Sequence, residues 1–168
     1  LAGLLEASEP DVAKIVRDPA SKVEPFGPSL SLGVVYRVSK FAPTRMIVHY
    51  IGVVSQGDAI ILTGDARKYA EFAERCGISV SRSEDKIEYG RAYLAISAGS
   101  KRFQILNSVE DIKPRPGLNE SQNAQFQEFV AKYSSKITAP SCTGSACFFY
   151  AINEQDLVLI QLTVESNG

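Results

Sequence analysis

Four side chains between residues 45 and 68 could together bind a phosphate. Arg45 opens one predicted strand, and Thr63 ends the next. Arg67 and Lys68 fall in the first turn of a predicted helix. In a hairpin the start of one strand lies beside the end of its partner, so Arg45 and Thr63 should be neighbours. Two guanidinium groups, an ammonium and a hydroxyl near a helix N-terminus suit a doubly charged phosphate. The alternative is that these residues are solvated surface charges.

The elements that must position these residues are predicted from hydrophobic pattern, turns and caps. The predicted helices span residues 8–18, 66–76 and 119–133. The predicted strands span residues 30–38, 46–54, 59–62, 78–83, 87–97, 102–106, 148–152 and 157–164. Helices lie between hairpins with no regular β-α-β alternation. This order predicts one α+β domain over residues 1–168, mainly antiparallel, as a barrel or strongly curled sheet.

Individual patterns support these assignments. Residues 46–54 (MIVHYIGVV) are apolar enough for a strand that is buried on both faces. Residues 78–83 alternate apolar and polar, as a half-buried strand does. Asp65 is placed to cap the helix at 66–76, and Gly77 to end it. Asn119 and Gln122 form a capping box for the helix at 119–133.

The motifs between residues 43 and 97 resemble a known family. The run RMIVHY, then Gly57, IILTGDARKYAEF and IEYGRAYLAIS, is similar to the FMN-binding split barrel of the pyridoxamine-phosphate-oxidase-like superfamily. The resemblance implies a split β-barrel that works as a homodimer, with its sites between two subunits. It implies FMN as cofactor, although some members bind deazaflavin or haem, and a small oxidoreductase of unknown substrate.

The resemblance also implies a set of cofactor-binding residues. Arg45, Arg67 and Lys68 would bind the flavin phosphate. Thr63, with the backbone around Met46 and Leu62, would lie along the ribityl chain and the ring.

The chain departs from the family at two points. Asp65 stands where many members have a neutral residue, and its charge opposes a phosphate unless it caps the helix. The chain has no Trp and lacks the C-terminal Arg-rich motif that holds pyridoxal phosphate, so it is not expected to be the vitamin-forming oxidase. The alternative is a non-enzymatic ligand-binding or protein-interaction domain on a β-barrel scaffold. Whether the chain is an enzyme stays open.

Composition excludes two classes of protein. Eighteen Lys and Arg residues against nineteen Asp and Glu residues leave a net charge of -1. A protein that neutralises many phosphates of a nucleic acid normally shows a basic excess. No run approaches the ~18 apolar residues of a membrane span. We expect a soluble protein of the cytoplasm or an organelle, with export as an open alternative, because a chain that starts at Leu1 does not identify its compartment.

The cysteines and the single histidine complete the candidates. Cys142 and Cys147 bracket a short flexible loop, so a disulfide and two free thiols are both open. With Cys76, three cysteines and one histidine do not fit a structural zinc site, and no metal is predicted. His49 lies inside an apolar strand, which favours a core or sheet-face role over catalysis. No pattern provides it with a nucleophile or an orienting group.

Overall fold

The computed structural model describes residues 1–55, 57–99, 101, 103–114, 116–154 and 156–166. Its first half contains α1 (Ala2–Leu5), α2 (Pro10–Arg17), β1 (Lys22–Pro25), β2 (Gly33–Phe41), β3 (Met46–Val54), β4 (Ala59–Ile61) and α3 (Ala66–Arg75). Its second half contains α4 (Ser83–Ala98), β5 (Phe103–Leu106), a 3-10 turn (Val109–Asp111), α5 (Glu120–Tyr133), β6 (Ser141–Thr143), β7 (Ala146–Asn153) and β8 (Asp156–Thr163).

The first sheet is antiparallel, with strand order β1-β2-β3-β4. Side chains on one face, including Val38 and Ile51, pack with residues of α1 and α2. Side chains on the other face, including Val35 and Tyr50, pack with residues of α3 and α4. Because helices cover both faces of the sheet, the side chains of β3 are apolar along most of its length. The strand predicted at 46–54 is confirmed with the same bounds.

Helix α3 begins and ends as its local sequence predicts. The backbone N–H of Lys68 donates to Oδ1 of Asp65 at 3.0 Å, which confirms the N-terminal cap. Tyr69 and Phe72 are buried on one face of the helix. Gly77 follows the helix with φ +72°, the left-handed backbone that favours glycine at this position.

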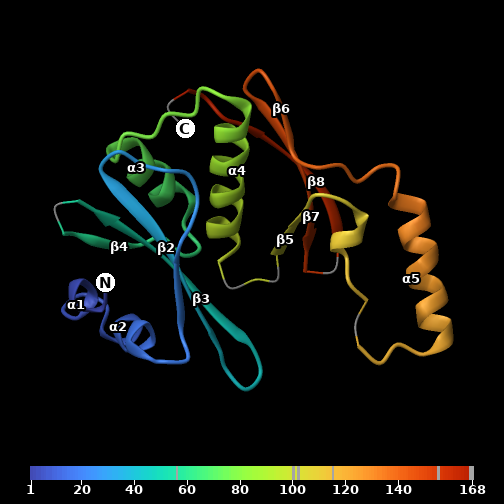
Figure 1. Ribbon diagram of the computed structural model, residues 1–168, viewed down its shortest axis with the longest axis horizontal. Coiled ribbons are helices and arrows are strands. Elements are labelled where there is room, and N and C mark those ends of the chain that lie inside the picture. Colours follow the sequence, from blue (N-terminus) through green and yellow to red (C-terminus); the bar gives the residue numbers. More distant parts are fainter. Residues whose placement is uncertain (56, 100, 102, 115, 155, 167–168) are drawn as a thin grey trace.

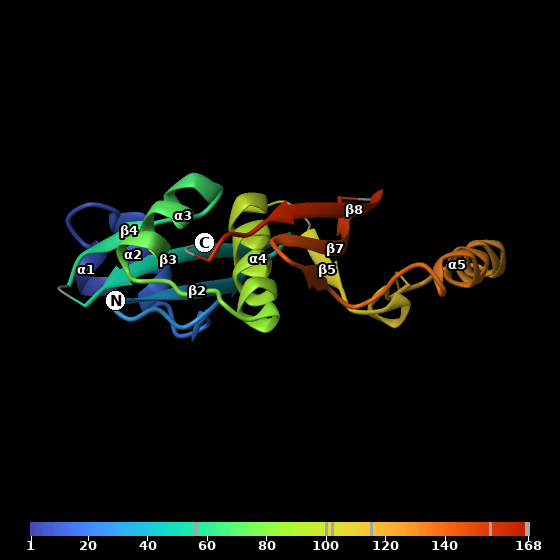
Figure 2. The ribbon, with the colours of Figure 1, turned by 90° about the horizontal axis from the view of Figure 1, so that it is seen from above.

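The prediction of strands at 78–83 and 87–97 was wrong. Residues 78–82 form a loop in which Ile78 and Val80 are buried, and residues 83–98 form helix α4. The helix lies between the two sheets (Figures 1 and 2). Its buried residues Tyr89 and Leu94 lie about 140° apart around its axis, so burial covers more than one side. A helix enclosed in this way loses the one-sided apolar pattern that identifies a surface helix.

The second sheet is built around β7. The β7–β8 hairpin is confirmed, with Phe149 opposite Ile160 in its antiparallel register. Strands β5 and β6 both pair with the other edge of β7. Cys142 of β6 and Cys147 of β7 stand opposite each other and form a disulfide, which settles the open alternative in favour of the cystine.

Other strands also differ from the prediction. Strand β1 was not predicted, and β6 was also missed. Strand β2 begins three residues later than predicted and continues to Phe41. Arg102, the first residue of the strand predicted at 102–106, lies outside the described residues, and β5 begins at Phe103.

Helix α5 lies away from the first sheet, at the opposite end of the molecule (Figure 1). Its predicted capping box is confirmed, because the N–H of Gln122 donates to Asn119 Oδ1 at 2.9 Å and the N–H of Asn119 donates to Gln122 Oε1. None of its residues is fully buried. Val130 and Tyr133 provide its contact with a small apolar cluster around Leu106.

The predicted α+β class with mainly antiparallel strands is confirmed, and the strands form two separate sheets. No closed barrel is detected in the strand pairings of the described residues. No helix in this part of the chain is long and apolar enough to cross a membrane.

Candidate functional site

One face of the β2–β3 hairpin forms the floor of the candidate site. Arg37 stands opposite Tyr50, and Ser39 stands opposite Val48. Directly opposed residues of antiparallel strands point to the same side of the sheet, and side chains two apart share that side. These residues therefore share the face whose upper part, at Val35, packs under α3 and α4.

The C-terminal end of α4 and the start of β5 close this floor into a pocket of about 590 Å³. That volume is in the range of small-molecule sites. The lining residues are Arg37, Thr44, Arg45, Met46, Val48, Tyr50, Ala95, Ala98, Gly99, Lys101, Phe103 and Gln104. They provide an apolar and aromatic surface with three cations.

The electrostatics of the pocket are positive. Its lining includes Arg37, Arg45 and Lys101, and no Asp or Glu is among the described lining residues. Nη1 of Arg37 lies 3.4 Å from Oε1 of Glu24, which offsets part of one charge. The carbonyls at the end of α4 add about half a negative charge. The charges of Arg45 and Lys101 exceed the partial negative charge at the end of α4, so the pocket favours an anion.

Arg37 has an unused donor at this site. Its Nε is buried and has no hydrogen-bond partner in the described part of the chain. A buried donor without an acceptor costs about 1–3 kcal/mol, so such donors are normally paired with protein, water or ligand. Because this donor is closed off from solvent, an acceptor oxygen of a bound anion would reach it only after the guanidinium group turns toward the pocket.

Tyr50 fixes the centre of the floor. Its side chain is buried, and its backbone N–H donates to Oγ1 of Thr63 at 2.8 Å. Burial raises the pKa of its hydroxyl, and the neighbouring Arg37 lowers it in part. The hydroxyl therefore stays protonated at neutral pH and acts as a hydrogen-bonding group beside the guanidinium.

The structure brings together only part of the residue set predicted from the sequence. Arg45 and Met46 line the pocket. Thr63 lies beside Tyr50. Tyr50 follows Arg45 by five residues of extended chain, a distance of ~17 Å. Arg45 and Thr63 are therefore not neighbours within the chain. The reason is the short β4, which pairs only with the far end of β3.

The other three predicted residues lie elsewhere. Leu62 is fully buried in the core. The side chain of Arg67 is 89% exposed and pairs with Glu71 at 2.9 Å. Lys68 pairs with Asp65 at 3.6 Å, and neither Arg67 nor Lys68 lines the pocket.

Sequence reasoning missed Arg37 and Lys101 as site residues. An arginine in the middle of an apolar strand was the available signal for Arg37, because an inward-facing cation in a strand needs a partner. No local pattern indicates Lys101. It reaches the site because α4 ends between the two sheets.

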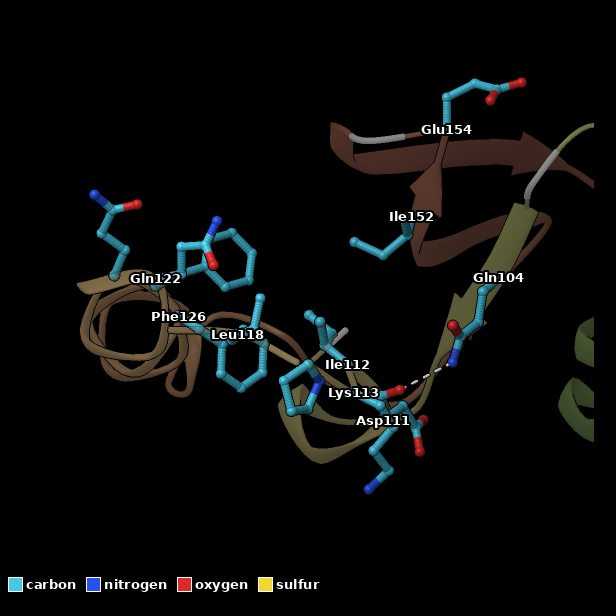
Figure 3. Close-up of a pocket in the computed structure, with 12 residues that line it drawn as sticks. Gln104, Asp111, Ile112, Lys113, Leu118, Gln122, Phe126, Ile152 and Glu154 are labelled. Carbon is cyan, nitrogen blue, oxygen red and sulfur yellow. Dashed lines mark hydrogen bonds between the residues drawn. The ribbon is translucent and has the colours of Figure 1, made fainter. Parts of the chain in front are cut away.

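A second cavity, of about 490 Å³, lies between α5 and the second sheet (Figure 3). Phe126 and Leu118 approach it from one side, and Ile152 of β7 from the other. Gln104 Nε2 donates to the backbone oxygen of Asp111 at 3.0 Å, so this polar group at its edge is already satisfied. None of the predicted site residues lies here.

The remaining candidates show no active centre. His49 is half-buried, and burial lowers its pKa. Cys76 is a buried free thiol whose pKa is raised by the same cause. Among the described residues, no group of three or more His, Cys, Asp or Glu side chains could hold a metal ion. No family model, no curated protein and no solved structure matches this chain.

Proposed function

We propose that this protein binds a small organic phosphate in the pocket between the β2–β3 hairpin, the end of α4 and the start of β5. The observation that carries the proposal is the presence of three cations in a lining whose described residues include no Asp or Glu. Phosphate oxygens accept several hydrogen bonds at once and pair well with guanidinium groups. The apolar residues Val48 and Phe103 would contact the organic part of the ligand.

Flavin mononucleotide is one ligand of this class, and the sequence resemblance favours it. The pocket provides two residues of the predicted set, Arg45 and Met46, together with a cationic and aromatic lining that suits a phosphate and a ring. The segment that resembles the family's later strand forms helix α4. The narrower form of the proposal is a flavin-binding split barrel, in which the bound flavin would supply redox chemistry.

Binding is proposed here as the function, with catalysis left to a bound cofactor. The polar side chains of the described lining are three cations, a tyrosine, a threonine and one amide, with no carboxylate, imidazole or thiol that could act as a general base near neutral pH. Arg37 and Arg45 would hold the phosphate. The hydroxyl of Tyr50 would donate to one of its oxygens.

The test compares affinities for FMN and for glycerol 3-phosphate in wild type and two single variants. Arg45→Ala should weaken both ligands about ten-fold or more, since hydrogen bonds to charged groups contribute about 1.5–3 kcal/mol. Arg67→Ala is the matched control, because Arg67 is exposed and outside the pocket. Absence of phosphate binding, or an equal loss in both variants, would contradict the proposed pocket.

The resemblance also implies a homodimer, in which a site between two subunits would be an alternative to the single-chain pocket. Sedimentation of the protein with and without FMN measures its mass directly. A dimer whose FMN affinity depends on Arg67 and Lys68 as well as Arg45 would support a site between two subunits. A monomer that binds the phosphate would favour the single-chain pocket.

A further inference from the structure

The turn of the β2–β3 hairpin presents two exposed apolar side chains. Phe41 is 79% exposed and Met46 is 41% exposed, although both are large apolar residues. They stand opposite each other in the register of the two strands. The turn that joins them, closed by a hydrogen bond from Ala42 N to Arg45 O at 2.8 Å, projects beyond the rest of the first sheet (Figure 1).

This apolar pair continues the surface of the phosphate pocket. Met46 lines the pocket, and Phe41 lies opposite it on the same side of the hairpin. Arg45 links the turn to the pocket, since it is the last residue of the turn and also lines the pocket. If the phosphate of a ligand occupies the pocket, the part of the ligand that extends out of the pocket would contact Met46 and Phe41.

The charges near the turn are positive. Lys40 pairs with Asp18, so its charge is compensated. Neither Arg45 nor Lys101 belongs to an ion pair within the described residues. A chain with a net charge of -1 therefore presents a local cationic surface beside an apolar turn.

A phospholipid supplies both chemistries in one molecule, a phosphate and acyl chains. Basic and aromatic side chains together are typical of surfaces that enter the lipid headgroup region. The turn projects from the sheet (Figure 1), so a protein partner would need a matching hollow for Phe41, whereas a bilayer interface accepts a projecting side chain at any position.

We propose that the β2–β3 hairpin docks on an anionic phospholipid surface, with a lipid phosphate in the pocket and Phe41 and Met46 among the acyl chains. This inference rests on the proposed phosphate site and names its ligand as a membrane headgroup. Arg45 and Lys101 would add attraction to the anionic surface, which falls as salt screens it.

The experiment measures cosedimentation with vesicles of phosphatidylcholine, with and without phosphatidic acid. Wild type should bind the anionic vesicles in low salt and the neutral vesicles much less. Phe41→Ser should weaken vesicle binding about ten-fold, because its apolar ring would no longer be buried among the acyl chains. Its affinity for glycerol 3-phosphate, a headgroup without chains, should not change.

Two matched variants control for general effects. Leu159→Ser removes an apolar side chain that is 56% exposed on β8, away from the pocket, and should leave vesicle binding unchanged. Arg45→Ala should weaken both vesicle and glycerol 3-phosphate binding. Circular dichroism checks that each variant keeps its fold, which we expect since Phe41 and Leu159 are exposed.

Three results would overturn the inference. If wild type binds glycerol 3-phosphate but not anionic vesicles, the pocket serves a free phosphate, and the proposed function survives. If Phe41→Ser binds vesicles as wild type does while salt abolishes binding, the surface is merely cationic and suits an acidic protein. If glycerol 3-phosphate does not bind either, the proposed function fails as well.

Discussion

Gly90 of α4 lies directly against the ring of Phe149 in β7. A Cβ at position 90 would lie 2.5 Å from Cζ of Phe149, closer than packed side chains approach each other. The central helix and the second sheet therefore meet at a position that only glycine fits. The same helix provides a wall of the candidate pocket at Ala95 and Ala98, so this contact helps to set the position of the wall.

Gly90→Ala should destabilise the fold, although alanine favours a helix by about 1 kcal/mol over glycine. Overpacking of a tight contact typically costs about 1–3 kcal/mol, and here it should outweigh the helix preference. Chemical denaturation measures the change in the free energy of unfolding. Ser97→Ala, at an exposed position of the same helix, is the control and should be near neutral or stabilising. A Gly90→Ala protein more stable than wild type would show that Phe149 moves freely.

Reduction of the Cys142–Cys147 disulfide should lower stability by about 2 kcal/mol, the chain-entropy value for a short loop. Thiol titration of the denatured protein should find one thiol, that of Cys76, before reduction and three after it. Reductant should destabilise wild type and leave a Cys142→Ala variant unaffected. Three thiols in the unreduced protein would contradict the disulfide.

Asn119→Ala should loosen α5 more than the rest of the chain. The helix has no fully buried residue, so its stability depends strongly on the capping box. Loss of a cap costs about 1 kcal/mol, which should raise amide hydrogen exchange in α5 about five-fold. Amides of β3 should exchange as in wild type. Ser121→Ala, an exposed position in the first turn, is the control, and equal exchange in both variants would argue against the cap.

His49 should titrate below its ordinary pKa of 6.5 in the folded protein, because burial disfavours its charged form. The unfolded state then binds the proton more readily. Stability contributed by this residue is complete above about pH 6.5 and declines as the pH falls below it. The single imidazole resonance in a proton NMR titration reports the folded value. A His49→Gln protein should lack this decline, and a folded pKa above 6.5 would contradict the prediction.

Local sequence was sufficient where short-range interactions determine the structure. The cap at Asp65, the capping box at Asn119 and the left-handed Gly77 each depend on groups within a few residues. Strand β3 was also predictable, because a run that is apolar on both faces remains recognisable when helices cover both. The candidate site residue Arg45 was predicted from its position at the start of that strand, and Met46 was predicted from the family resemblance.

The tertiary structure decided the rest. Residues 83–98 form a helix that is enclosed between two sheets, and such burial removes the one-sided apolar periodicity that identifies a surface helix in the sequence. The position of Thr63 relative to Arg45 depends on how far β4 pairs along β3, which no local pattern specifies. Lys101 reaches Arg37 and Arg45 at the pocket because α4 ends between the sheets. The sequence by itself determined the caps and most strands, whereas long-range packing assembled the pocket.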